Sequence, residues 1–271
     1  MKMKRSEKLG MLTGLVVGVL LLLISVFMIF QTTCKVWGAE KPANATQQGI
    51  DVSSHQGKID WEQVKNSALA DYAIIRCGYG VNQTDKDDKY WDYNSSECER
   101  LGIPYGTYLY SGADTTAKAK SEAEHVVRLL QGKNLTYPIY YDMEADMLNQ
   151  LSSTQIGNIA KTFLNTMESY GYKNVAVYSN KYLFETKLTA SVFSDYPKWI
   201  AQHSNKCTYR GSYHMWQYST QGVIPGISEK VDLNYKIGNW TYAGYSSAKK
   251  TVVVKPKATT IKSLKKSGKK A

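Results

Sequence analysis

The amino-acid sequence predicts an α/β fold in which a parallel sheet closes into an irregular (β/α) barrel. Eight short apolar or aromatic runs of strand length follow one another between residues 49 and 235, and helical patterns separate at least the first five. The region 48–243 has about 190 residues, fewer than the about 250 of a regular eight-fold barrel. The last three runs are closely spaced, so we expect the later half of the barrel to be irregular.

The expected elements alternate along this region. The strands are Gly49–Val52, Tyr72–Cys77, Pro104–Tyr110, Tyr137–Met143, Asn174–Tyr178, Lys198–Gln202, His214–Tyr218 and Val231–Tyr235. Helices are expected where apolar residues recur at helical spacing between capping residues. They are Ile59–Ser67 with Asp60 as N-cap, Asp88–Leu101 ending at Gly102, Thr115–Leu130 ending before Gly132, and Ser153–Tyr170 ending at Gly171.

The N-terminal part of the chain differs in composition from the barrel region. Residues 1–10 are basic, residues 11–30 carry no charged side chain, and residues 31–47 form a short polar stalk. Twenty helical residues span about 30 Å, the thickness of one hydrocarbon core. We therefore expect 11–30 to be a transmembrane signal anchor, with 1–10 in the cytoplasm and the barrel outside. The alternative is a cleaved signal peptide, which would release a secreted protein.

The net charge of +11 is concentrated at the ends of the chain. Residues 249–271 hold nine lysines and no acidic residue, whereas residues 42–248 carry a net charge of −2. A near-neutral barrel argues against nucleic-acid binding. The lysine-rich tail, residues 244–271, has two interpretations. It is a solvated linker or the start of a truncated further module, or it is a segment that holds the protein near an anionic polymer through weak, salt-screened contacts.

Cysteine and histidine are sparse. Cys34, Cys77, Cys98 and Cys207 are too few for a disulfide framework in a domain of this size, and the four histidines lack the spacing of metal ligands. We expect neither a metal site nor a cofactor. The disulfide status of Cys77, Cys98 and Cys207 stays open.

Acidic residues recur where expected strands end, the position of reactive groups in (β/α) barrels. Asp51 ends the first strand, Asp142 and Glu144 end the fourth, and Asp232 lies in the last. Because residues i and i+2 of a strand point to the same side, Asp142 and Glu144 share a face. Burial and a neighbouring carboxylate raise the pKa of one such group, and glycosidic cleavage requires one protonated and one ionised carboxyl group.

Two later strands each place a tryptophan near a glutamine: Trp199 near Gln202, and Trp216 beside Gln217. An indole face stacks on a sugar ring, and a glutamine amide can hydrogen-bond hydroxyl or acetamido groups. Together with the clustered acids, these pairs favour a glycan-binding cleft.

These motifs resemble the glycoside hydrolase family 25 lysozymes. The matching segments, in the family's order, are Asp51–Gly57, Ile59–Trp61, Asp142–Glu144, Trp199–Gln202, Trp216–Tyr218 and Val231–Asn234. The resemblance implies an irregular, TIM-barrel-like fold and an N-acetylmuramidase that cleaves the β-1,4 bond between N-acetylmuramic acid and N-acetylglucosamine in peptidoglycan. At residues 76–80 the chain reads Arg-Cys-Gly-Tyr-Gly, where many members have Lys, Ser or Thr, Glu and Gly. This chain therefore lacks any contact that the glutamate makes in those members.

By this resemblance Glu144 matches the general acid/base and Asp142 the residue that orients or stabilises the substrate's N-acetyl group. Asp51 and Asp232 match the other two acids of the cleft. Two mechanisms stay open. In one, the substrate's acetamido oxygen attacks and Glu144 later activates water; in the other, water attacks directly with Asp51 as base.

Further residues are expected to line the cleft: Arg76, Tyr108, Tyr110, Tyr141, Trp199, Gln202, Trp216, Gln217 and Asn234. The expected partners are peptidoglycan glycan strands, the cell membrane through residues 11–30, and anionic wall polymers through residues 249–271. Two other functions stay open: a non-catalytic glycan-binding module, against which the presence of all four acids argues, and a membrane-anchored adhesion protein.

Overall fold

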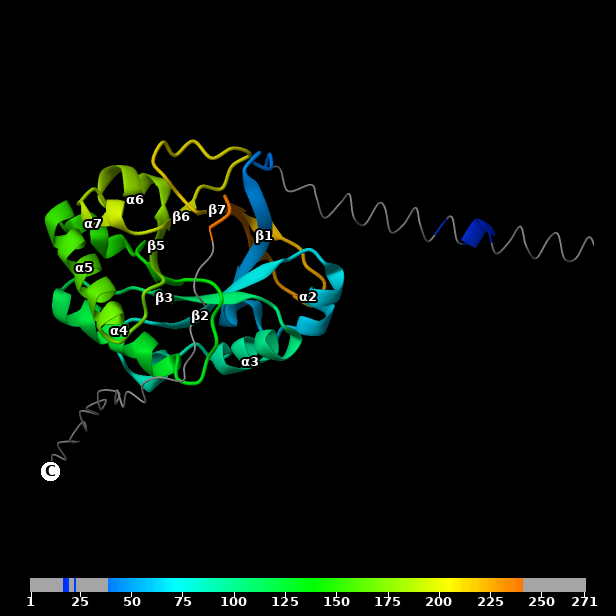
Figure 1. Ribbon diagram of the computed structural model, residues 1–271, viewed down its shortest axis with the longest axis horizontal. Helices are drawn as coiled ribbons and strands as arrows, with labels where there is room; N and C mark the ends of the chain where they lie inside the picture. Colours follow the sequence, from blue (N-terminus) through cyan, green and yellow to red (C-terminus); the bar gives the residue numbers. More distant parts are fainter. Residues whose placement is uncertain (1–16, 20–21, 23–38, 241–271) are drawn as a thin grey trace, which may run out of the picture.

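The eight expected strands form one closed barrel in which each strand pairs with its neighbours in chain order (Figure 1). The computed structural model describes residues 17–19, 22 and 39–240. The strands are β1 (Ala45–Val52), β2 (Tyr72–Tyr79), β3 (Tyr105–Tyr110), β4 (Ile139–Asp142), β5 (Val175–Asn180), β6 (Lys198–Ala201), β7 (Met215–Gly222) and β8 (Val231–Ile237). The prediction of an eight-stranded barrel is confirmed. β1 begins earlier than expected, so residues 45–47 of the expected stalk belong to the barrel.

The barrel is parallel from β1 to β7, but β8 runs antiparallel to both β7 and β1. The expectation of a parallel sheet therefore holds for β1 to β7 and not for β8. Only eight residues, 223–230, separate β7 from β8. A parallel crossover needs a dozen or more residues, whereas a short connection suits an antiparallel neighbour. This is the irregularity expected in the later half of the barrel.

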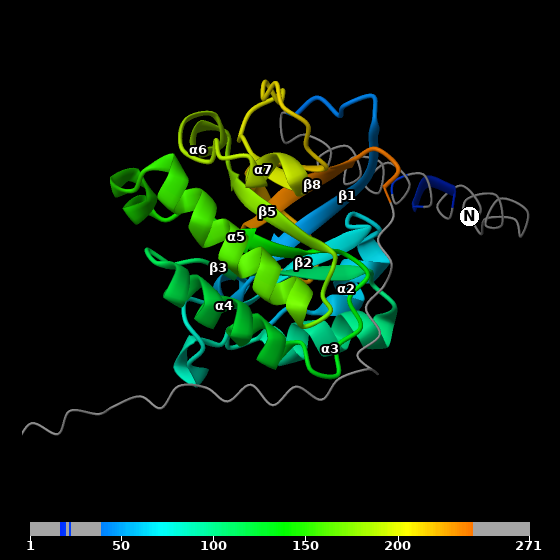
Figure 2. The ribbon, with the colours of Figure 1, turned by 60° about the vertical axis from the view of Figure 1, so that its left-hand side comes forward.

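Helices lie on the outside of the strands. They are α2 (Trp61–Ser67), α3 (Trp91–Leu101), α4 (Thr116–Leu129), α5 (Ser153–Ser169), α6 (Lys181–Thr186) and α7 (Val192–Asp195). The first four confirm the four expected helices, and α6 and α7 were not expected. α4 and α5 pack side by side across the outer surface of the barrel (Figure 2).

Capping residues set the helix boundaries. Asp60 caps α2 by accepting a hydrogen bond from the backbone of Gln63, and Ser152 forms a capping box with Gln155 at the start of α5. Gly102 ends α3 in the left-handed conformation, with φ of 65°, which glycine adopts without a steric penalty.

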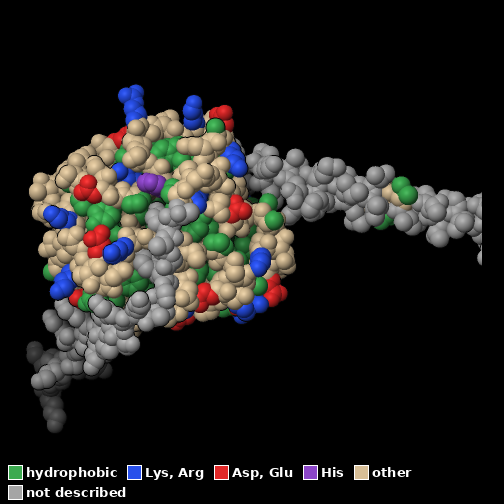
Figure 3. All heavy atoms as spheres, in the orientation of Figure 1, with side chains coloured by type: hydrophobic (Ala, Val, Ile, Leu, Met, Phe, Trp, Pro, Cys, Tyr) green, Lys and Arg blue, Asp and Glu red, His purple; other side chains and the backbone are tan. Residues whose placement is uncertain are grey.

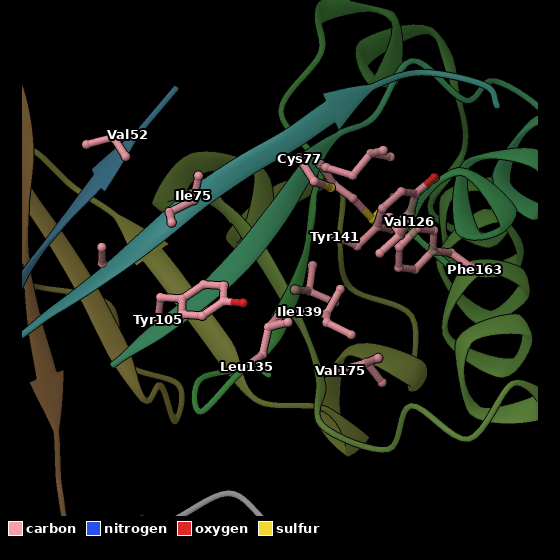
Figure 4. Close-up of a cluster of buried hydrophobic side chains, with 14 of the residues drawn as sticks. Val52, Ile75, Cys77, Tyr105, Val126, Leu135, Ile139, Tyr141, Phe163 and Val175 are labelled. Atoms are coloured by element: carbon pink, nitrogen blue, oxygen red, sulfur yellow. The ribbon is translucent and has the colours of Figure 1, made fainter. Parts of the chain in front are cut away.

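The apolar core has two layers, one on each side of the strands. The outer layer lies between the strands and the helices and includes Tyr141 stacked on Phe163 of α5, near Val126 of α4 (Figure 4). The inner layer fills the barrel and includes Tyr72, Tyr140 and Trp199. Side chains of a strand alternate between these two layers.

The expected membrane anchor falls almost wholly outside the described residues. Of residues 11–30 only 17–19 and 22 are described, and residues 1–10, most of the stalk and the tail beyond Trp240 are not. Across the described ranges there is no helix whose length and apolar content would allow it to cross a membrane. On the face shown in Figure 3, basic and acidic side chains are interspersed, in keeping with the near-neutral charge of the barrel region.

Candidate active site

Four carboxyl groups lie at the end of the barrel where β1 to β7 finish, here called the carboxyl mouth. Asp51 is the penultimate residue of β1, Asp142 ends β4, and Glu144 follows two residues later. Asp232 is the second residue of β8, and because β8 is antiparallel it lies directly opposite Asp51 in the strand register. The structure thus brings together the four acids singled out in the sequence.

Asp51 is buried and is held by two side-chain amides. Its Oδ2 accepts hydrogen bonds from Asn234 Nδ2 at 2.7 Å and from Gln217 Nε2 at 3.0 Å. Asn234 in turn accepts a 2.8 Å hydrogen bond from Trp199 Nε1 through its own Oδ1. This chain of contacts fixes the Asp51 carboxylate against β7 and β8, so its position is set by the strands rather than by a loop.

Asp51 and Asp232 act on each other. Burial raises the pKa of Asp51 well above its usual range, and the charge of Asp232 raises it further. Burial raises the pKa of Asp232 to about 6, and its hydrogen bond with Asp51 opposes this rise. Because the two carboxyl groups are coupled, they titrate as a pair.

Asp142 and Glu144 form a second acidic pair. Burial raises the pKa of Asp142, with Glu144 and Asp51 adding to the rise and Arg76 opposing it. Oδ1 of Asp142 is buried and has no hydrogen-bond partner among the described residues. Burial also raises the pKa of Glu144, as does the charge of Asp51, while His203 and a hydrogen bond with Tyr178 lower it. The pair therefore keeps a proton to higher pH than free carboxyl groups do.

Five other expected cleft residues also point into the barrel. Gln217, Asn234 and Trp199 belong to the Asp51 network, and the ring of Tyr108 meets that of Trp199 edge-on at 6.2 Å. Arg76 makes an ion pair of 2.8 Å with Asp88.

Tyr110 lies near the second acidic pair. It pairs with Asp142 in the register of β3 and β4. Burial and the charges of Asp142 and Glu144 raise its pKa.

Three expected cleft residues, Tyr141, Trp216 and Gln202, do not point into the barrel. Tyr141 lies in the outer layer, where its hydroxyl donates a 2.6 Å hydrogen bond to Glu122 of α4. Trp216 is also buried in the outer layer, against Tyr218 and Tyr235. Both are neighbours of inward-pointing residues, Asp142 and Gln217, and alternation along a strand turns them outward.

Gln202 also differs from the expectation. Its side-chain oxygen accepts a 2.8 Å hydrogen bond from the backbone of Thr208, so it shapes the loop after β6. The structure gives Gln202 a loop-holding contact instead of a position on the barrel interior.

Sequence reasoning missed two polar residues of this site. His203 Nε2 and the Tyr178 hydroxyl each lie 2.9 Å from Oε1 of Gln217. Because an amide oxygen accepts, the His203 contact is a hydrogen bond in the form of the ring that carries a proton on Nε2. Tyr178 could have been found, because it ends an expected strand in the register of Asp142. His203 lies beyond the end of β6, where the alternation of side chains along a strand no longer predicts which way a side chain points.

No group of three or more His, Cys, Asp or Glu side chains within the described part of the chain is arranged to hold a metal ion. Cys77, Cys98 and Cys207 are free thiols.

Comparison with known proteins connects this site to a family. The family model for glycosyl hydrolases family 25 matches residues 50–227. The autolytic lysozyme of Clostridium acetobutylicum is 30% identical over 188 residues, which cover 69% of this chain and 55% of that protein. The uncharacterized protein YegX of Escherichia coli K12 is 27% identical over 199 residues, covering 71% of this chain and 70% of that protein.

Solved structures agree with this assignment. The modular autolysin LytC from Streptococcus pneumoniae, solved in complex with a synthetic peptidoglycan ligand, has a TM-score of 0.63 and 33% identity over 70% of this chain. The match covers 46% of LytC, so this chain spans about half of that protein. A family 25 glycosyl hydrolase from Bacillus anthracis, 21% identical over 75% of this chain and 94% of its own, shares the fold with a TM-score of 0.65. The chain therefore belongs to glycosyl hydrolases family 25 and is a lysozyme-type glycosidase.

Proposed function

We propose that this protein hydrolyses the β-1,4 bond between N-acetylmuramic acid and N-acetylglucosamine in peptidoglycan, with Glu144 as the general acid. The observation that carries the proposal is the half-buried Glu144, whose pKa is raised beside the buried Asp142. A protonated carboxyl group can donate to the departing glycosidic oxygen, and such general-acid help is typically worth about 10²–10⁴-fold in rate.

Asp142 is proposed to act on the sugar's acetamido group. Its buried Oδ1 has no hydrogen-bond partner among the described residues, so it is available to an N–H of the substrate. Once positive charge develops at the anomeric carbon, an ionised Asp142 would stabilise it. Glu144, having lost its proton, would then act as base toward water.

The hydrogen bonds that Asp51 accepts disfavour it as the base that activates water. Two amides hold its Oδ2, and burial beside Asp232 raises its pKa. Because these amides already occupy Oδ2, Asp51 is poorly placed to take a proton from water, which favours attack by the substrate's acetamido oxygen over direct attack by Asp51-activated water. The first route retains the anomeric configuration and the second inverts it.

The bond specificity has a direct test. Purified protein is incubated with peptidoglycan, and the new reducing ends are reduced with borohydride and identified by mass spectrometry. Reduced N-acetylmuramic acid at the new ends supports the proposal, whereas reduced N-acetylglucosamine would assign cleavage of the other glycosidic bond. The anomer formed first, followed by NMR, separates the retaining route from the inverting one.

We also propose a membrane anchor through residues 11–30 and retention at the wall through residues 249–271, from the composition of these segments. Nine lysines without an acidic residue can hold the enzyme near carboxylate and phosphate polymers, in a salt-sensitive manner. Removal of 249–271 should weaken binding to intact sacculi at low salt and leave hydrolysis of short soluble strands unchanged. Equal sacculus binding with and without residues 249–271 would contradict retention by the tail.

The membrane anchor has a separate test. Release of the protein from membranes by salt alone would contradict the anchor.

A further inference from the structure

The tryptophans that the sequence suggested for sugar stacking have no open ring face. Trp199 and Trp216 are each 1% exposed, and Tyr140 and Tyr141 of β4 are equally buried. A sugar ring can stack only on an aromatic face that solvent reaches in the free protein. A sugar bound at the carboxyl mouth therefore has to use other aromatic side chains.

Among the aromatic residues on the described strands, only Tyr79 is exposed. It is the last residue of β2, and its exposed fraction is 40%. Within residues 39–240 the other exposed large hydrophobic side chains are Tyr182 and Val223, which follow the carboxyl ends of β5 and β7. Single exposed apolar residues are common on protein surfaces, but here all three lie at the catalytic end of the barrel.

Strand pairing places Tyr79 in one row with the acids. Tyr79 pairs with Tyr110 of β3, and Tyr110 pairs with Asp142 of β4. Paired residues of neighbouring strands point to the same side of the sheet, so both tyrosines share the inward side of Asp142. Adjacent strands lie about 4.8 Å apart, which puts the backbone of Tyr79 about 10 Å from that of Asp142. A sugar at Tyr79 is thus a different one from the sugar at the acids.

The ring of Tyr79 is held in position without being covered. Nζ of Lys86 lies 4.9 Å from the centroid of the ring, and the hydroxyl donates a long hydrogen bond of 3.4 Å to the backbone oxygen of Asp85. The backbone N–H of Gly80 donates to the carbonyl oxygen of Tyr110 at 2.9 Å, which ties the end of β2 to that of β3. A ring that is already oriented loses little conformational entropy when a ligand stacks on it.

We propose that Tyr79 is a sugar-stacking residue of a subsite on the β2 side of the carboxyl mouth, and that the glycan strand runs from the acids past Tyr110 to Tyr79. This inference rests on the proposed function, which supplies the strand. Tyr79 lies within residues 76–80, where the chain departs from many family members. Because the subsite holds a sugar away from the bond that is cleaved, it contributes to the affinity for the strand and not to the chemical step.

The first test is the steady-state kinetics of the full chain on soluble glycan strands of graded length. Tyr79→Ala should raise KM for long strands about tenfold and leave kcat within about twofold of wild type. The ratio of the two KM values should fall toward one as the strands are shortened, since short strands do not reach the subsite. Tyr79→Phe, which keeps the ring, should match wild type.

Tyr196→Ala is the control for these measurements. It removes a partly exposed tyrosine two residues before β6, at the opposite end of the barrel, and should leave KM unchanged at every strand length. If Tyr79→Ala folds poorly, Tyr79→Leu keeps apolar bulk without an aromatic face and gives the same comparison.

A binding measurement separates failure of this inference from failure of the proposed function. Isothermal titration calorimetry with long glycan strands, in the Glu144→Gln background to suppress hydrolysis, compares Tyr79 with Tyr79→Ala and Tyr79→Phe. A Kd about tenfold weaker for Tyr79→Ala alone supports the subsite, even if the new reducing ends are not N-acetylmuramic acid. Muramic reducing ends together with equal Kd values would keep the bond assignment and reject the subsite.

Two further results would overturn the inference. One is an equal loss of affinity in Tyr79→Ala and Tyr79→Phe, which would assign the effect to the hydroxyl group and its contact with Asp85. The other is a fall in kcat of Tyr79→Ala that is the same for strands of every length, which would make Tyr79 a support of the acids and not a sugar contact.

Discussion

The side-chain amide of Asn234 joins Asp51 to Trp199 across the inside of the barrel. Its Nδ2 donates to Oδ2 of Asp51 at 2.7 Å, and its Oδ1 accepts from Nε1 of Trp199 at 2.8 Å. Asn234 is fully buried, so neither contact can be replaced by bulk water. One residue of β8 therefore positions an acid of β1 and an aromatic ring of β6.

Asn234→Ala should lower the free energy of unfolding by about 1–3 kcal/mol, because it leaves the buried indole N–H of Trp199 without its acceptor. Turnover should fall as well, since Asp51 loses one of its two amide donors. Urea unfolding measures the first effect. Asn165→Ala, on the exposed face of α5, is the matched control. Equal stability of the two variants would argue against this role of Asn234.

Tyr141→Phe should affect stability and spare turnover. The lost hydroxyl donates at 2.6 Å to Glu122, a buried carboxylate that also accepts from Ser111 and from the backbone of Gly112. Removing one donor from a buried carboxylate costs about 1–3 kcal/mol. Because Tyr141 points away from Asp142, kcat should stay within about threefold of wild type. A large fall in kcat with normal stability would place Tyr141 in the cleft after all.

Asp232→Asn should stabilise the protein at neutral pH. Burial raises the folded-state pKa of Asp232 from 3.8 to about 6, so the folded protein binds this proton more tightly than the unfolded chain does. The free energy of unfolding that this group contributes therefore falls as pH rises from about 4 to about 6. Thermal unfolding should show a higher Tm for the variant at pH 7 and little difference below pH 4. A lower Tm for the variant at pH 7 would contradict the raised pKa.

Gly49→Ala tests the packing inside the barrel. A Cβ at this position would clash with the ring of Tyr72, which is fully buried in the inner layer. Overpacking of this kind typically costs about 1–3 kcal/mol. Gly112→Ala is the control, because the nearest atom to its added Cβ is 4.0 Å away. Equal denaturant midpoints for the two variants would show that the ring of Tyr72 moves aside freely.

The sequence predicted the eight strands because each is a short buried run between turn residues, and the barrel then followed from their number. It did not predict the direction of β8, which depends on the length of a connection rather than on strand composition. α6 and α7 were missed because they are short helices of six and four residues, which give too little periodicity to distinguish them from loops.

The candidate site was predictable where strand alternation applies. Asp51, Asp142 and Gln217 lie on their strands in the inward phase, and the same rule turns Tyr141 and Trp216, which were expected in the cleft, toward the outer layer. His203 and Asp88 could not be predicted, because they come from loops whose direction is set by tertiary contacts. The ion pair of Asp88 with Arg76 joins residues 12 apart from different elements, which no periodicity encodes.

Glu144 is proposed to donate the proton that allows the glycosidic bond to break. The most direct measurement is the kcat of Glu144→Gln on soluble peptidoglycan strands, beside Glu62→Gln, the same substitution at an exposed position on α2. Glu144→Gln, folded as shown by an unchanged circular dichroism spectrum, should lose at least about 10²-fold in kcat, while Glu62→Gln should match the wild type. A Glu144→Gln enzyme that turns over within tenfold of the wild type would contradict this role of Glu144.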